Sequence, residues 1–269
     1  MTERGEGLGG GQGLGRGQGL GGALGRWQWP LALVLLALAV AQAASVILPA
    51  IGQSISVGRD LELYLDATRR WMAGGPFYPA RQLAGPYDIA FGDILYPPYA
   101  LILFIPFTVL PSLLWWAIPL AILIAVVVSW RPSILALAVI AVCATFPNTI
   151  ALVLNGNPVL WASAAIALGT RLGWPDVLAA IKPSVAFVAL IWARRRSWWV
   201  ATAAGVAVSL LFLPLWPDFV TAIRNAHAPF GLLYSLSDLP FMLIPVVAWL
   251  GTTRVPPQWA HPPSLDDRT

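Results

Sequence analysis

The chain has 269 residues, of which 58% are hydrophobic and only 10% are charged, with a formal net charge of +4. An ordinary soluble domain carries about one quarter charged residues, so this composition excludes that class and predicts an integral membrane protein. The single Cys143 excludes an intramolecular disulfide, and two histidines are too few for a histidine metal centre. We expect no metal, no other cofactor and no nucleic-acid partner.

The N-terminal segment 1–26 is rich in glycine and contains three arginines. Such a segment cannot bury a core, so we expect a disordered cytoplasmic tail. The apolar run 30–51 follows it. Its Ala41-Gln42-Ala43 step imitates a signal-peptide cleavage site, but the run continues beyond this point, which favours a retained membrane anchor. Either interpretation places the next loop, 52–95, outside the cytoplasm.

Apolar runs recur along the rest of the chain, and about 18 or more apolar residues are typical of a membrane-spanning helix. The sequence therefore predicts an all-α, polytopic membrane protein with about eight transmembrane helices. The expected spans are 30–51, 97–110, 112–130, 133–146, 158–171, 175–193, 197–215 and 239–251. The polar, proline-rich segment 252–269 is predicted to be a disordered tail.

The orientation is predicted from the basic residues near the ends of the spans, which favour the cytoplasmic side. Arg194-Arg195-Arg196 is the densest basic cluster. Eight spans then place both termini inside, in a multi-pass protein of the cell membrane. In this arrangement eight acids, including Asp176 and Asp238, lie outside.

Within the outer loop, Arg59 to Ala73 has the pattern of an amphipathic helix that ends at Gly74-Gly75-Pro76. Asp66 is expected to pair with Arg69 and Arg70 on a solvated stripe. Leu61, Tyr64, Leu65, Thr68, Trp71 and Met72 form the opposite apolar side. Asp60 lies at the edge of that apolar side.

Asp60 is the acid of this helix that faces away from the solvated stripe. A carboxylate on the apolar side of a surface helix is desolvated, which raises its pKa and suits it to deprotonate a hydroxyl group. The alternative role is to cap the N-terminus of the helix. The residues favour neither role over the other.

Lys182 is the only lysine, and it lies inside the expected span 175–193, about seven residues below the outer surface. A cation at that depth usually faces a cavity or an anion, and a lipid phosphate would be a suitable partner. The alternative is a lysine that reaches the membrane surface without a role. Pro183 follows it and could open the backbone locally.

Further polar candidates lie outside these two segments. Asn155 and Asn157 form a turn with Gly156 that could bind a polar ligand, although a plain tight turn is the simpler interpretation. Arg224 and His227 lie in the outer stretch 218–238, where they could contact a phosphate or assist a proton transfer. Tyr96-Pro97-Pro98 opens the second expected span and is interpreted as structural.

Together these features resemble family 87 of the GT-C class of membrane glycosyltransferases, the polyprenol-phosphate-mannose-dependent mannosyltransferases. The resemblance lies in Asp60-x-x-x-Tyr64, Gly74-Gly75-Pro76-Phe77-Tyr78, Tyr96-Pro97-Pro98, Asn155-Gly156-Asn157 and Ile181-Lys182-Pro183, in that order. The chain looks shortened at its C-terminus relative to the family, and a glutamine of the family's Gly-Gln-x-Asn-like step is missing. On this resemblance, 27–251 would be a GT-C-like domain.

The resemblance implies transfer of a sugar, mannose in this family, from a polyprenyl-phosphate donor to a glycolipid or glycan acceptor outside the cytoplasm. Asp60 would be the catalytic base. The substrate-binding residues would be Tyr64, Lys182, Arg59, Asn155, Asn157, Arg224 and His227. The bilayer is the other partner, and no cofactor is implied.

Two other classes of function remain open. The chain could be a non-catalytic member of the family or an assembly partner of another glycosyltransferase. A transporter would be expected to contain paired charges within the membrane and an internal repeat, whereas the sequence has one lysine and no evident repeat.

Overall fold

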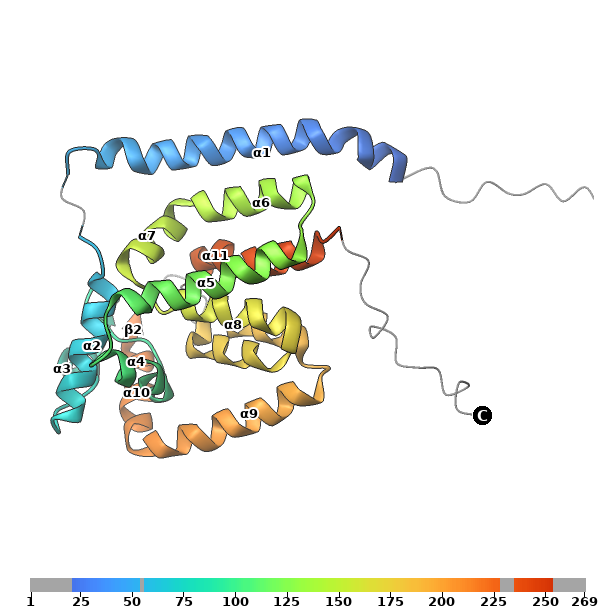
Figure 1. Cartoon of the computed structure of the whole chain (residues 1–269). Helices are drawn as coiled ribbons and strands as arrows, with labels where there is room; N and C mark the ends of the chain where they lie inside the picture. The colour runs from blue at the N-terminus through green and yellow to red at the C-terminus, as the bar shows by residue number, and fades with distance from the viewer. Residues whose placement is uncertain (1–20, 54–55, 228–234, 254–269) are drawn as a thin grey trace, which may run out of the picture.

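A computed structural model describes residues 21–53, 56–227 and 235–253, with the side chains of 21–26 left out of the description. These residues form an all-α fold (Figure 1). A two-residue parallel pair joins β1 to β2, with Tyr87 opposite Ala226 and Asp88 opposite His227. The elements are α1 (Gly21–Ala50), α2 (Arg59–Met72), α3 (Ala80–Ala84), β1 (Tyr87–Asp88), η1 (Pro98–Ala100), α4 (Leu101–Phe107), α5 (Leu113–Trp130), α6 (Ile134–Thr145), α7 (Pro147–Asn155), α8 (Val159–Leu172), η2 (Trp174–Ile181), η3 (Pro183–Trp192), α9 (Arg196–Ser209), η4 (Leu210–Leu215), α10 (Trp216–Asn225), β2 (Ala226–His227), η6 (Leu236–Asp238) and α11 (Leu239–Leu250).

Several helices are long and apolar enough to cross a membrane, which makes the chain a multi-pass membrane protein. In the described part of the chain three helices qualify: Trp27–Ala50, Leu113–Trp130 and the bent stretch Arg196–Asn225. The pair α6 and α7, bent by 61°, would be a fourth. Four further apolar helices are shorter, so the described residues show three or four of the expected eight spans by length. The shorter helices are Pro98–Phe107, Val159–Leu172, Pro183–Trp192 and Leu236–Leu250.

Five arginines lie at one end of the bundle, which we call the basic end because Asp176 is the one described acid there. It contains Arg131, Arg171, Arg194, Arg195 and Arg196. Contacts hold this end together: the Trp130 indole donates to Thr170 Oγ1, and Thr252 Oγ1 donates to the carbonyl of Trp130. The opposite end, which we call the loop end, contains α2, α3, α4 and α10 (Figure 1).

The expected span 175–193 is instead a hairpin of two short helices, η2 and η3, that reverses direction at Lys182. Both ends of the hairpin lie at the basic end, because Arg195 donates to the carbonyl of Arg171 and its side chain packs against Gly173. Asp176 interacts electrostatically with Arg195 there. Asp176 therefore lies at the same end as Arg195, whereas the sequence predicts the two on opposite sides of the membrane. A proline after Lys182 removes a backbone donor, which favours such a break.

The helix in the expected span 97–110 is also shorter than predicted. The short helix η1 leads directly into α4, and α4 ends at Phe107. Its aromatic residues pack beneath α2, where Phe104 stacks on Tyr64 with ring centres 5.1 Å apart. Trp115 of α5 lies against Phe107 at 4.9 Å. This segment therefore belongs to the loop end, where its aromatic residues pack against the buried side of α2.

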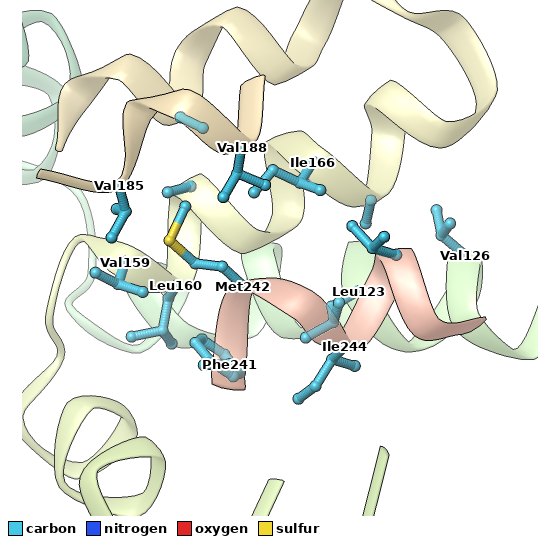
Figure 2. Close-up of a cluster of buried hydrophobic side chains, with 14 of the residues drawn as sticks. Leu123, Val126, Val159, Leu160, Ile166, Val185, Val188, Phe241, Met242 and Ile244 are labelled. Carbon is cyan, nitrogen blue, oxygen red and sulfur yellow. The ribbon is translucent and has the colours of Figure 1, made fainter. Parts of the chain in front are cut away.

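The main apolar core lies between α5, α8, α11 and η3. Figure 2 shows Met242 of α11 between Leu160 of α8 and Val185 and Val188 of η3. Met242 and Val185 are fully buried. The hairpin is thus packed into the bundle and not laid on its surface, which holds Lys182 at the start of α11.

The ends of the expected tails are more ordered than predicted. The first helix begins at Gly21, inside the segment 1–26 predicted to be disordered, and it continues to Ala50. At the other end, Thr252 pairs with Pro132, and the Thr253 amide donates to the carbonyl of Arg131. The remaining tail residues, 1–20 and 254–269, lie outside the described residues.

Candidate functional site

The amphipathic helix predicted from the sequence is confirmed as α2, which begins at Arg59 and ends at Met72. Leu61, Tyr64, Leu65 and Thr68 are buried, as their spacing predicts, whereas Met72 is exposed. Asp66 pairs with Arg69 at 3.0 Å. Arg70 instead donates to the carbonyls of Pro76 and Phe77, so its predicted pairing with Asp66 is wrong.

The start of α2 is tied to the turn between α7 and α8. The Gly58 amide donates to the carbonyl of Leu154 at 2.9 Å. Gly58 itself is the N-cap, with φ 84°, and no side chain caps the helix. The capping role considered for Asp60 is therefore excluded.

The Asp60 carboxylate is bound by Asn157 across the α2–α8 junction. Asn157 Nδ2 donates to Asp60 Oδ2 at 2.6 Å. Asn157 Oδ1 accepts hydrogen bonds from the Tyr96 hydroxyl at 3.0 Å and from the Val159 amide at 3.1 Å. These two donors fix the amide orientation, so its NH₂ group must face Asp60.

The second carboxylate oxygen of Asp60, Oδ1, receives no hydrogen bond from any residue that the structure describes. Burial raises the pKa of Asp60 above the usual value of an aspartate. The Asn157 hydrogen bond, Lys182 and Arg59 oppose this effect, while Asp238 adds to it. The result is a half-buried carboxyl group that is more basic than usual and has one oxygen available.

Lys182 lies at the tip of the hairpin, and its side chain forms an ion pair with Asp238. Both residues are buried, with 7% and 4% of their surface exposed. Asp238 uses its other oxygen, Oδ1, to accept from Asn148 Nδ2 at 2.8 Å. The anion that the buried position of Lys182 demands is therefore supplied by the chain itself.

Tyr96 lies between these two groups. The Lys182 ammonium is 5.9 Å from the centre of the Tyr96 ring, and the Tyr96 hydroxyl binds Asn157. Lys182 and Asp238 both act electrostatically on Asp60. We refer to Asp60, Asn157, Tyr96, Lys182, Asp238 and Asn148 as the polar site. With both acids ionised, it carries one cation and two anions.

The other predicted site residues are only partly brought to the polar site. Tyr64 is buried and packs edge-on against Tyr96 at 5.0 Å, so it supports the site from below. Arg59 is exposed and lies over the Phe91 ring at 4.1 Å, though it acts electrostatically on Asp60. Asn155 ends α7 without a side-chain hydrogen bond in the described structure.

Arg224 and His227 lie apart from the polar site, and no hydrogen bond or ion pair between described residues links them to it. Both are exposed. Their segment packs on α3 and β1, where Asn225 donates to the carbonyl of Gln82 and the Tyr87 hydroxyl donates to that of Ala222. The geometry therefore offers no support for a direct role of either residue beside Asp60.

Sequence reasoning missed Tyr96, Asp238 and Asn148 as members of the polar site. Tyr96 was assigned a structural role, and Asp238 was placed only among the outer acids. One feature could have indicated Asp238: a lone lysine in an apolar run requires an acid from elsewhere in the chain. Nothing in the sequence distinguishes Asn148 from other asparagines in turns.

Gly156 sets the direction of the turn that carries Asn157. Its φ is +68°, and a Cβ atom there would lie 2.8 Å from the Trp116 ring and 3.2 Å from Leu61 Cβ. Gly156→Ala is expected to destabilise the protein by about 2–4 kcal/mol, from left-handed strain plus overpacking. Gly205→Ala in α9, with no atom near the added methyl group, is the control and should cost nothing in an unfolding measurement. Equal stability of the two variants would contradict this account of the turn.

The fold and the polar site define a helical, multi-pass membrane protein with a cluster of polar residues at one end of its bundle. Comparison with known proteins found no matching family model, no similar curated protein and no similar solved structure.

Proposed function

We propose that the chain is a membrane glycosyltransferase that moves a sugar, mannose by the family resemblance, from a polyprenyl-phosphate donor to a hydroxyl group of a glycolipid or glycan. The observation that carries the proposal is the state of Asp60. Its carboxyl group has a raised pKa, one oxygen held by Asn157 and one oxygen available to a substrate. This combination suits a general base.

In the proposed reaction, Asp60 Oδ1 accepts the proton of the acceptor hydroxyl. The hydroxyl oxygen attacks the anomeric carbon of the donor sugar and forms the new glycosidic bond. The bond from that carbon to the phosphate oxygen breaks, and polyprenyl phosphate leaves with the electron pair. A single displacement of this kind inverts the anomeric configuration. Lys182 lies near enough to act on Asp60, and it supplies the positive charge that offsets the phosphate.

The two ends carry similar numbers of described arginines, but those of the loop end are balanced by acids, which supports an orientation in which the basic end is cytoplasmic and the polar site faces the other side. The described acids other than Asp176 lie toward the loop end, where they alternate with basic residues. Residues 21 and 253 both lie toward the basic end, in agreement with cytoplasmic termini. Transfer would then use the outer-leaflet supply of lipid-linked sugar in the cell membrane.

This orientation makes a prediction about the hairpin. In a Cys143→Ser background, single cysteines at Trp174 and Ser197 should both react with a membrane-impermeant maleimide from the cytoplasmic side only. Both positions are exposed at the basic end. A single span over 175–193 would place the two positions on opposite sides. Labelling from opposite sides would therefore contradict the hairpin.

The proposal is tested with purified protein in proteoliposomes supplied with a radiolabelled polyprenyl-phosphate mannose and a lipid acceptor. Formation of labelled product that depends on the protein supports it. Absence of product with every lipid-phosphate sugar tried, from a protein that is folded, would refute it.

The pH dependence of transfer follows from Asp60. Since its pKa is raised, the carboxylate is protonated at a higher pH than an ordinary aspartate, and the base is lost as the pH falls through that raised pKa. We expect the acid limb of the rate profile to lie above the usual titration range of aspartate. An Asp60→Glu variant that retains activity should shift this limb. A rate independent of pH across this range would argue against Asp60 as the base.

A second candidate is a non-catalytic member of the family or a membrane protein that assembles with another transferase. The observation that favours it is the Lys182–Asp238 pair, which leaves no uncompensated positive charge at the polar site. Such a protein would form no product, so the transfer assay separates the two candidates.

A further inference from the structure

The Asp238 carboxylate occupies a position with the features of an anion-binding site. Two donors from different elements converge on it: the Lys182 ammonium at the hairpin tip, and Asn148 Nδ2 at the start of α7. Asn148 lies in the first turn of a nine-residue helix, where the helix dipole also favours negative charge. The bound carboxylate thus marks where these groups would hold an anion.

Resting on the proposed function, we propose that Lys182 and Asn148 form the binding site for the phosphate of the lipid-linked donor, and that Asp238 occupies this site until the phosphate displaces it. Asp238 is then an internal competitor of the donor. The displacement is a change of partner at Lys182 and breaks no covalent bond.

Charge explains why displacement is needed. Lys182 is one cation acting beside two acids, Asp60 and Asp238. A phosphate added while Asp238 stays in place would put a third anion next to a single ammonium group, and like charges at such distances are strongly unfavourable. When the Asp238 side chain moves away from Lys182, the Lys182 ammonium group can pair with the phosphate instead.

The structure also provides access to this position. Asn148 Nδ2 lies within 3.3 Å of the Ser237 hydroxyl, and Ser237 and Pro147 are both exposed. The anion site is therefore buried at Lys182 and open beside Asn148.

The test measures binding of farnesyl phosphate, farnesol and inorganic phosphate to the purified full chain in phosphatidylcholine nanodiscs. Asp238→Asn keeps the shape of the side chain and removes its charge. We expect it to bind farnesyl phosphate about tenfold more tightly than the wild type. Lys182→Met in the same background should abolish the gain, and Asn148→Leu should reduce it. Asp88→Asn, which removes an exposed acid from β1, is the matched control and should bind like the wild type.

Farnesol should not compete, because it lacks the anion, and inorganic phosphate should bind more weakly because it lacks the lipid chain. Equal affinity for inorganic and farnesyl phosphate would overturn the assignment to a lipid. If Asp238→Asn binds no more tightly than Asp88→Asn, the competitor role is refuted. Thermal unfolding of each variant with and without farnesyl phosphate keeps the test valid if a variant is less stable. A larger increase in unfolding temperature on adding farnesyl phosphate to Asp238→Asn than to the wild type supports the site. An equal increase refutes it.

The transfer assay on the same variants separates this inference from the proposed function. Tighter binding by Asp238→Asn without product formation by the wild type would retain the anion site and refute the transferase. Product formation by the wild type with an unchanged donor KM in Asp238→Asn would retain the transferase and refute the competitor.

Discussion

Replacing Asp60 by asparagine is expected to lower the rate of sugar transfer by about 10²- to 10⁴-fold, the usual contribution of a general base. The carboxamide oxygen of the introduced asparagine can still accept the hydrogen bond from Asn157, so the local geometry should be retained. It removes only the group that accepts the proton. Donor binding should not weaken, because the proposed phosphate ligands are Lys182 and Asn148 and the replacement removes a negative charge that acts on Lys182.

The same variant should be no less stable than the wild type. Burial raises the pKa of Asp60, so the folded state favours the protonated form, and stability is lost as the pH rises from the pKa of the unfolded chain to the raised pKa of the folded state. Asparagine is neutral at every pH and avoids that loss. Glu62→Gln, an exposed acid on the same helix, is the control and should retain full activity. Full transfer activity in Asp60→Asn would remove Asp60 from the mechanism.

Removing one partner of the Lys182–Asp238 pair is expected to cost about 3–5 kcal/mol of folding free energy. Lys182→Met leaves Asp238 buried with only Asn148 to support its charge. The double variant Lys182→Met/Asp238→Asn removes both charges and should recover most of the lost stability. Denaturant unfolding of the single and double variants measures both effects as a double-mutant cycle.

Arg69→Gln is the matched control, because Arg69 pairs with Asp66 on the exposed side of α2. An exposed pair contributes about 0–1 kcal/mol, so this variant should unfold almost like the wild type. Additive effects of the two replacements at the buried pair would show that Lys182 and Asp238 do not interact in solution. The variants would then also argue against the anion site.

The sequence was sufficient where a pattern is local. The period of Leu61, Tyr64, Leu65 and Thr68 predicts α2 and its buried face. The lone lysine in an apolar run predicts a cavity or an anion beside Lys182, and the anion in the structure is Asp238 and not the expected lipid phosphate. These inferences depend only on residues close to one another along the chain. They identified Asp60 and Lys182, which the structure places in one polar site.

The sequence was insufficient where the structure depends on a reversal of the chain or on a partner residue that is distant in the sequence. Apolar composition over 175–193 is the same for one span and for a hairpin, and the reversal shows only in tertiary contacts such as Arg195 against Gly173. Asp238 is 56 positions from Lys182, and Asn157 is 97 positions from Asp60. No period or spacing relates residues so far apart. The number of spans is uncertain from sequence for another reason: an apolar run well below about 18 residues does not show by its length whether it crosses the membrane or turns back within it.

The most direct test of the central claim is to follow both products of one reaction catalysed by the purified wild-type chain. A β-linked polyprenyl-phosphate mannose labelled in the sugar and in the lipid is supplied with a glycolipid acceptor in proteoliposomes. We predict one polyprenyl phosphate released for each sugar transferred, and an α-linked product by NMR, because a single displacement with Asp60 as base inverts the anomeric carbon. Release without transfer, or a product that retains the β configuration, would contradict this mechanism.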